Sequence, residues 1–277
     1  MRRFALIFAC CAGFYFLLFL AFRTVTDVGE LRTHYPRVIY DPKTESASVE
    51  VVRQRPPHWV NLHDISPIAV AAIVLSEDWA FWQHNGFDWN QLWDAMETNL
   101  KKGKFVRGGS TITQQVIKNV YLTKEKTLLR KAKEAILTMR IERHVSKKRI
   151  LEIYLNIVEL GPGLYGIGPA ANYYFHKTPA QLNAKEGAYL AMLLPSPKRY
   201  SVSFRKKALT PFARSAIHGI LGKLAATKRL TDEQYQLADI TPLSFEATQI
   251  ATPEQIPDDE DEAPEEDSIV APVGEAI

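Results

Sequence analysis

The chain has 277 residues, of which 46% are hydrophobic, and a formal net charge of +3. The length and the hydrophobic fraction suffice for one good-sized domain with its own core plus appendages. Both cysteines, Cys10 and Cys11, are neighbours in an apolar N-terminal stretch. Adjacent side chains on a helix point about 100° apart and do not pair. Because the remaining chain has no cysteine, the composition excludes a disulfide-stabilised scaffold.

Residues 4–22 form nineteen consecutive positions without a charge. About twenty apolar residues cross a bilayer as a helix, whereas a cleaved signal peptide has a shorter apolar region and a small-residue cleavage site. We therefore expect an uncleaved transmembrane anchor. Arg2 and Arg3 precede it, so the positive-inside tendency places residues 1–3 in the cytoplasm and everything after Arg23 outside it.

Residues 23–58 read as a polar stalk with four prolines and a short strand at Arg37–Tyr40. Helical patterns follow in a domain that we place at 59–226. Ser66 and Pro67 mark the start of the first helix, which puts Glu77, Phe81 and His84 on one face if it continues that far. Further helices are expected at about 89–100, 111–122, 127–144, 147–158, 168–175, 180–193 and 208–226. With few alternating patterns, the fold class is mainly α.

The chain closes with an extension at 227–251 and an acidic tail at 252–277. The tail has ten acids and no Lys or Arg, a composition that cannot bury enough apolar surface to offset chain entropy, so we expect disorder. Without the tail, 34 bases face 21 acids, a net charge of +13. Such a basic body suits an anionic bilayer surface or a phosphate-bearing substrate.

Glu77 interrupts an otherwise apolar stripe. Partial burial would raise the pKa of its carboxyl group, as suits a group that exchanges protons near neutrality. A helix-end acid paired with a base is an equally good interpretation of the pattern alone. Asp78 points about 100° away and is expected to orient the turn or a nearby base. Phe81 and His84 would shape the Glu77 pocket, while Asp88 is a candidate N-cap for the next helix.

The sequence RGGSTITQQ, residues 107–115, predicts a glycine turn that opens a helix. Such a start offers backbone N–H groups and a favourable dipole to an anion. Thr111, Gln114 and Lys118 are spaced to form one polar face, next to the hydroxyl of Ser110. The alternative is that Ser110 is an ordinary N-cap and the glutamines lie on the surface.

Residues 124–149 hold ten Lys or Arg and three Glu. Most of these charges are expected on a solvated face. Arg130, Lys131 and Glu134 differ, because their spacing places them on one side of a helix. A carboxylate held by two cations stays ionised, the opposite of the environment expected for Glu77, and such divergence is typical of divided catalytic roles. Glu152, Tyr154, Asn156, Tyr174 and Phe175 are interpreted as structural.

Two motifs carry a family resemblance: EDWAFWQHNGFD at 77–88 and RGGSTITQQVIKN at 107–119. Together with RKAKE (130–134), RILEIYLN (149–156) and EGAYLAMLLPSP (186–197), they resemble the family 51 peptidoglycan glycosyltransferases, the family of monofunctional biosynthetic transglycosylases and of the transglycosylase domain of class A penicillin-binding proteins. The resemblance spans about residues 60–200. It implies a lysozyme-like helical lobe with a smaller membrane-proximal lobe, preceded here by one transmembrane helix.

The resemblance also implies residue roles. Glu77 corresponds to the general base, and Glu134 to a second catalytic glutamate beside the donor pyrophosphate. The implied substrate-binding residues are Asp78, Phe81, His84, Gly109, Ser110, Thr111, Gln114, Gln115, Lys118, Lys126, Arg130 and Lys131. Lys126 stands where the family leads us to expect arginine, and Gly187 where it leads us to expect alanine. No cofactor is obligatory and no metal ligand is assigned, although Mg²⁺ or Mn²⁺ could bind at the pyrophosphate.

The implied activity is polymerisation of lipid II into β-1,4-linked glycan strands with inversion and release of undecaprenyl pyrophosphate. The expected partners are lipid II, the growing strand, the membrane, and division or elongation proteins, but no nucleic acid. We expect a single-pass protein of the bacterial inner membrane, with its N-terminus inside and its catalytic domain in the periplasm. We also expect it to be monofunctional, because the KTG motif of a transpeptidase is absent. The alternatives are a lysozyme-like lytic enzyme and a non-catalytic membrane-anchored division scaffold.

Overall fold

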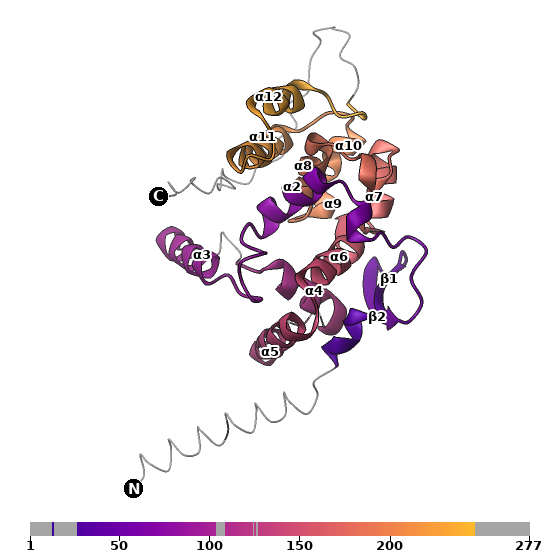
Figure 1. Ribbon diagram of the computed structural model, residues 1–277, viewed down its shortest axis with the longest axis vertical. Coiled ribbons are helices and arrows are strands. Elements are labelled where there is room, and N and C mark those ends of the chain that lie inside the picture. Colours follow the sequence, from indigo (N-terminus) through magenta and orange to yellow (C-terminus); the bar gives the residue numbers. More distant parts are fainter. Residues whose placement is uncertain (1–12, 14–26, 104–108, 124, 126, 247–277) are drawn as a thin grey trace.

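The computed structural model describes residues 13, 27–103, 109–123, 125 and 127–246, and these are mainly helical (Figure 1). The α-helices are α2 (Pro67–Glu77), α3 (Trp89–Lys102), α4 (Ile112–Tyr121), α5 (Leu128–His144), α6 (Lys147–Ile157), α7 (Ile167–Phe175), α8 (Ala184–Leu193), α9 (Pro197–Tyr200), α10 (Val202–Arg205), α11 (Pro211–Ala226) and α12 (Asp232–Ile240). The 3₁₀ turns are η1 (Val28–Arg32), η2 (Leu62–Asp64) and η3 (Pro179–Gln181). Strands β1 (Tyr35–Asp41) and β2 (Ser46–Val52) form one antiparallel pair, and β3 (Glu159–Gly161) and β4 (Leu164–Tyr165) another.

The mainly helical fold class is confirmed, and each predicted helix has a counterpart. Two of them begin later than predicted because side chains cap them. Asn183 accepts a hydrogen bond from the backbone N–H of Glu186 and starts α8, and Thr210 caps α11 in the same way. Unpaired N–H groups in the first turn make such capped positions the natural starting points of a helix.

Three predictions fall outside the described residues: the anchor at 4–22, apart from Gly13, the acidic tail at 252–277, and Lys126. Within the ranges that the structure describes, no helix combines the length and apolar character needed to cross a membrane.

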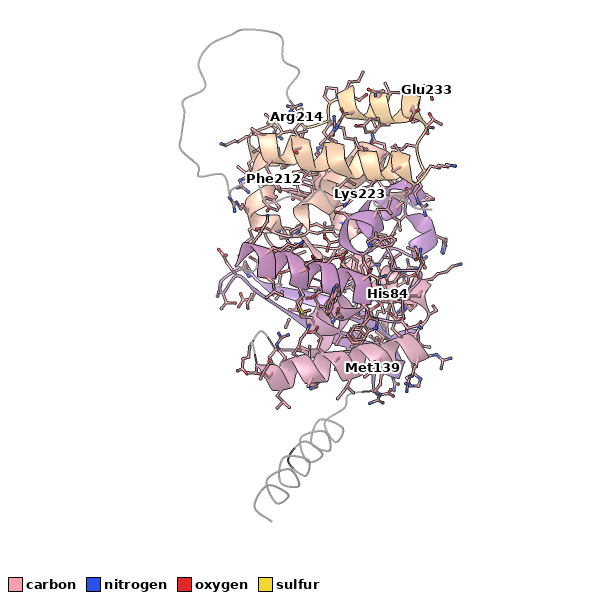
Figure 2. The ribbon with its side chains drawn as sticks, turned by 90° about the vertical axis from the view of Figure 1, so that its left-hand side faces the viewer. His84, Met139, Phe212, Arg214, Lys223 and Glu233 are labelled. Atoms are coloured by element: carbon pink, nitrogen blue, oxygen red, sulfur yellow. The ribbon has the colours of Figure 1, made fainter. Side chains whose placement is uncertain are left out.

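The helices form successive layers, with α12 on α11, α8 and α2 beneath them, and α4, α6 and α5 on the far side (Figure 1). Figure 2 shows the same order from the side, with His84 between the layer that carries Glu233 and helix α5, which carries Met139. Helix α8 lies at the centre, and all ten of its residues are buried. It packs against both α2 and α11, so the helix that ends at Glu77 rests on a fully buried support.

Helices α2 and α8 approach each other unusually closely at Gly187. A Cβ atom there would lie 2.6 Å from the Cα and 3.0 Å from the Cβ of Ala69, closer than nonbonded carbon atoms can come without a shift. The alanine that the family pattern leads us to expect would therefore force the two helices apart. Glycine at 187 sets the spacing between the core and the helix of Glu77.

The segment predicted to be a stalk is folded against the helical domain. Its η1 turn contacts α5, β1 contacts α6 and β2 contacts α4. The guanidinium group of Arg149 in α6 lies over the rings of both Tyr35 and Trp59, 4.7 and 4.9 Å from their centroids. Its guanidinium group also donates hydrogen bonds to the carbonyls of Leu31 and His34, over 3.1 and 2.7 Å.

Two further residues of α6 hold the same segment. Glu152 accepts hydrogen bonds from the indole of Trp59 at 3.1 Å and the backbone of Leu62 at 3.0 Å. Asn156 pairs with both the N–H and the carbonyl of Val60, each at 2.8 Å. The stalk prediction is therefore wrong for residues 27–58, although the strand predicted at 37–40 is present within β1. The structural interpretation of Glu152 and Asn156 is confirmed.

The extension after residue 226 also belongs to the folded body. Helix α12 packs on α11, and the buried ammonium group of Lys185 donates to the carbonyls of Asp239 and Thr241, both at 2.7 Å. Cations stabilise the unpaired carbonyls at a helix C-terminus. Beyond α12, Leu243 and Phe245 are buried in the core, so the body reaches at least to that point.

The close contact of α2 and α8 predicts opposite effects for two helical glycines. Gly187→Ala should lower the free energy of unfolding by about 1–3 kcal/mol, because it overpacks the contact with Ala69. Gly219→Ala in α11 should raise it by up to about 1 kcal/mol, because alanine favours a helix and nothing lies within 4 Å of the added Cβ. Urea unfolding of both variants tests this, and a Gly187→Ala protein as stable as the parent would contradict it.

Candidate active site

Glu77 is the last residue of α2, at the end of a helix whose middle is buried against the core. Its carboxylate accepts a hydrogen bond from the side-chain amide of Gln115 at 2.9 Å. Burial raises the pKa of Glu77, while the Gln115 hydrogen bond and the charge of Lys118 oppose that rise. The sequence-based expectation of a partly buried, raised-pKa carboxyl is confirmed.

Helix α2 does not continue past Glu77, so the prediction that Phe81 and His84 share its helical face is wrong. Asp78 ends the helix, and residues 79–86 form turns. Phe81 is fully buried, and the ammonium group of Lys147 lies 4.3 Å from its ring centroid. The helix stops because the Asp78 side chain has partners elsewhere in the fold. A direct contact of Phe81 or His84 with substrate stays a prediction.

Asp78 is a completely buried carboxylate that connects the two motifs. One oxygen accepts a hydrogen bond from Nε2 of His84 and the other from the backbone N–H of Ile112, both at 2.9 Å. Nδ1 of His84 accepts a hydrogen bond from the backbone N–H of Gly86 at 3.1 Å. This second bond assigns the ring proton to Nε2, where it faces Asp78. The expectation that Asp78 orients the turn is confirmed.

Gly86 adopts φ of 94°, a backbone conformation that side chains disfavour. A Cβ atom there would also lie 2.7 Å from Cγ2 of Thr138 in α5. The carbonyl of Gly86 accepts a hydrogen bond from the Thr111 hydroxyl at 2.8 Å. Two residues later, Asp88 caps α3 by accepting a hydrogen bond from the N–H of Gln91 at 2.9 Å, as predicted.

The start of α4 differs from the predicted anion site. Thr111, rather than Ser110, is the N-cap, and it forms a capping box with Gln114. The N–H groups of Thr111 and Gln114 bond within that box, at 3.0 and 3.2 Å, and that of Ile112 bonds to Asp78. These three donors are therefore used inside the protein. The dipole of α4 stabilises the buried Asp78 carboxylate instead of a ligand.

The polar stripe predicted along α4 is divided in the same way. Thr111 and Gln114 are buried, whereas Lys118 is exposed, so the three residues do not form one open face. Ser110 is exposed and Gly109 is half-buried. A Cβ atom at Gly109 would lie 3.2 Å from the Cα of Leu92, so this glycine allows the chain to pass close to α3.

Glu134 in α5 is only 3% exposed. It contacts the ammonium group of Lys131, the guanidinium of Arg130 at 3.5 Å, and the side-chain amide of Gln114 at 3.3 Å. The predicted grouping of Arg130, Lys131 and Glu134 is confirmed. Across the residues that the structure describes, no group of three or more His, Cys, Asp or Glu side chains is arranged to hold a metal ion.

Consecutive glutamines of α4 thus serve different glutamates. Gln114 donates to Glu134, and Gln115 donates to Glu77. A dipeptide in a helix directs its two side chains about 100° apart, which suits two targets on different sides of one helix. Helix α4 therefore connects one carboxylate whose pKa is raised by burial with another that two cations surround.

Tyr154 of α6 is a site residue that the sequence does not reveal. Its hydroxyl donates to Oε1 of Gln115 over 3.5 Å, and it also favours the charged form of Glu77. In the sequence Tyr154 stands among the buried isoleucines and leucines of α6, the pattern of a core residue. Only the packing of α6 against α4 brings its hydroxyl to the site.

The sequence matches the transglycosylase family over residues 45–220. It is 46% identical over 142 residues to a biosynthetic peptidoglycan transglycosylase of Acinetobacter baylyi, covering 51% of this chain and 63% of that protein. It is 47% identical over 142 residues to the protein of that description in Dechloromonas aromatica, covering 51% and 62%. These two matches thus span less than two thirds of each relative.

A longer match is found with a biosynthetic peptidoglycan transglycosylase of Azoarcus sp. strain BH72, which is 40% identical over 202 residues, covering 71% of this chain and 86% of that protein. The matched family region contains both glutamates, the glycine turn and the glutamine pair described above. It also begins inside the hairpin of β1 and β2, in agreement with the folding of that segment onto the helices. The chain belongs to the transglycosylase family.

Proposed function

We propose that this protein is a peptidoglycan glycosyltransferase that polymerises lipid II into β-1,4-linked glycan strands with release of undecaprenyl pyrophosphate. The observation that carries the proposal is the pair of glutamates held by neighbouring glutamines of α4 in opposite environments. Two carboxyl groups in such different surroundings, one buried beside an amide and one beside two cations, are typical of divided acid–base and electrostatic roles. The chain's membership of the transglycosylase family supports the same assignment.

In the proposed reaction Glu77 is the general base. It takes the proton from the 4-hydroxyl of the acceptor N-acetylglucosamine as that oxygen attacks the anomeric carbon of the donor. The bond from that carbon to the lipid pyrophosphate breaks on the opposite side, so an α-linked donor yields a β-linked product. A base is most effective when its pKa is near the working pH, which matches the burial of Glu77.

The pyrophosphate leaving group needs positive charge. Arg130 and Lys131 each contact one carboxylate oxygen of Glu134, which holds the two cations together. The exposed Lys118 adds a third charge from α4. Preorganised cations stabilise charge that develops on a leaving group. A lytic enzyme that cuts finished glycan would have no pyrophosphate for these cations. Binding of Mg²⁺ or Mn²⁺ at the pyrophosphate stays a prediction.

Helix α3 supports the membrane side of the proposal. It stands out from the body (Figure 1), and among the side chains of α3 that the structure describes only Ala95 is buried. An exposed apolar stripe runs along it, formed by Trp89, Leu92, Trp93, Met96 and Leu100. Their spacing places them on one helix face, and aromatic residues on such a face are typical of helices that lie in the membrane interface. Lys101 and Lys102 follow at its end, where anionic headgroups would attract them.

We further propose that the catalytic domain lies on the periplasmic face of the bacterial inner membrane, behind a single anchor at residues 4–22 with its N-terminus inside. A lysozyme-like lobe built on α2 and α8 and a smaller membrane-proximal lobe that includes α3 agree with this placement. Division or elongation proteins as partners stay a prediction.

Glu77→Gln should abolish polymerisation while lipid II still binds, because the amide keeps the shape and loses the base. Loss of a general base lowers the rate by about 100- to 10,000-fold. Purified full-length protein incubated with lipid II and analysed on a gel distinguishes polymer, glycan fragments and no product.

The matched control is Glu186→Gln, which changes another buried glutamate. Glu186 closes the capping box of α8 and also pairs with Lys177 at 2.7 Å. Glutamine keeps the box and loses the ion pair, so the free energy of unfolding should fall while the activity of the folded protein persists. Loss of a general base lowers the rate by at least about a hundredfold. If Glu77→Gln keeps more than about a twentieth of the parent's activity, the loss is too small and Glu77 is not the base.

Trp93→Asp should lower turnover of lipid II in vesicles several-fold and leave turnover of a short-chain, water-soluble lipid II analogue unchanged, because a charge on the apolar stripe disfavours contact with the membrane. Asn90→Asp places the same charge on the exposed polar side of α3 and should affect neither substrate. Equal effects of Trp93→Asp on both substrates would mean that the stripe serves the fold or the site instead.

A further inference from the structure

The reaction described above gives no role to Tyr154, and Gln115 enters it only as the hydrogen-bond partner of Glu77. Tyr154 is completely buried, and its hydroxyl lies 3.5 Å from Oε1 of Gln115. On the other side of the same amide, Nε2 lies 2.9 Å from Oε2 of Glu77. The three side chains come from α6, α4 and α2, so their arrangement depends on the packing of three helices.

The direction of these hydrogen bonds follows from the chemistry of the groups. An ionised carboxylate only accepts hydrogen bonds, and the amide of glutamine has one accepting and one donating end. If Gln115 were turned around, its oxygen would face the carboxylate of Glu77 and its NH₂ group would face the tyrosine. The hydroxyl of Tyr154 favours the productive orientation because it donates to the amide oxygen.

We infer that Tyr154 is a positioning residue, which acts through Gln115 to keep an N–H donor on Glu77 and so sets the pH at which Glu77 becomes a base. Gln115 accordingly works on the base, in addition to any contact with substrate. The inference rests on the proposed glycosyltransferase function and on the role of Glu77 in it.

Charge and burial around the three residues agree with this inference. Burial raises the pKa of Tyr154 far above its usual value, and the nearby charge of Glu77 raises it further, so the hydroxyl keeps its proton throughout the working range. Burial also raises the pKa of Glu77, and the charge of Asp78 adds to the rise, while the hydrogen bond from Gln115, the charge of Lys118 and the nearby hydroxyl of Tyr154 lower it. The pair therefore offsets a burial that would otherwise keep the base protonated.

The test is the pH profile of polymerisation by the full-length protein with lipid II. Glu77 must be ionised to accept a proton, so activity is lost as the pH falls through its pKa. Tyr154→Phe removes a donor that favours the ionised form and should move this acid limb to higher pH by about half a unit to one unit. At a fixed pH on the acid limb, kcat of Tyr154→Phe should be about three- to tenfold lower than that of the parent, with KM unchanged. At higher pH the two kcat values should become equal.

Two controls separate positioning from a loss of stability. Tyr174→Phe removes another buried tyrosine hydroxyl, which donates to the carbonyl of Leu160 at 2.7 Å, and should lower the melting temperature without moving the acid limb. Gln115→Met should shift the limb in the same direction as Tyr154→Phe, and adding Tyr154→Phe to it should shift the limb no further, since coupled residues are not additive.

The outcomes distinguish this inference from the proposed function. If the parent protein makes no polymer, the proposed function fails. If the parent is active and Tyr154→Phe has the same acid limb, or if its shift adds fully to that of Gln115→Met, the positioning role is overturned. Should Tyr154→Phe not fold, Gln115→Met decides alone, because an unshifted limb there shows that the amide does not set the protonation of Glu77.

Discussion

The site depends on the buried carboxylate of Asp78. Its two oxygens bind His84 and the backbone N–H of Ile112, so one side chain joins the end of α2, the turn that follows it and the start of α4. A buried charge without such partners would be strongly destabilising. Because Asp78 has them, the end of α2 is fixed against α4, and Glu77 at that end faces Gln115. The N-terminus of α4 thereby binds a carboxylate of the chain itself and holds the two motifs together.

Helix α4 then divides the roles of the two glutamates. One face of it carries Gln114 toward Glu134, and the next residue carries Gln115 toward Glu77. Glu134 has two cations beside it, while the pKa of Glu77 is raised by burial. The same fold element thus supports a carboxylate that organises positive charge and a carboxyl group suited to proton transfer. Neither environment comes from α4 alone. Helix α5 supplies the cations beside Glu134, and the position of Glu77 at the end of α2 places its carboxyl group inside the fold.

Sequence patterns predicted what depends on neighbours along the chain. The helices, the Asp88 cap and the group of Arg130, Lys131 and Glu134 all follow from periodicity and from spacing within one helix. The end of α2 was mispredicted because Asp78 bonds to a residue 34 positions away, which no local pattern records. The same long-range bond explains why the backbone N–H of Ile112 at the start of α4 serves Asp78 and not a ligand. Tyr154 was missed because a buried tyrosine in an apolar helix has the pattern of a core residue whatever its hydroxyl contacts.

Helix α6 links the site to the part of the chain that precedes the domain. Arg149, Glu152 and Asn156 are spaced by three and four residues and so lie on one face, where they hold residues 31–62 through the contacts described above. Tyr154 falls on the opposite face, toward Gln115. One helix therefore fixes both the segment that leads back to the proposed anchor and the amide beside Glu77. In the proposed reaction the base acts on a substrate held in the membrane and needs a fixed orientation relative to it, and a helix with these two faces would supply that orientation.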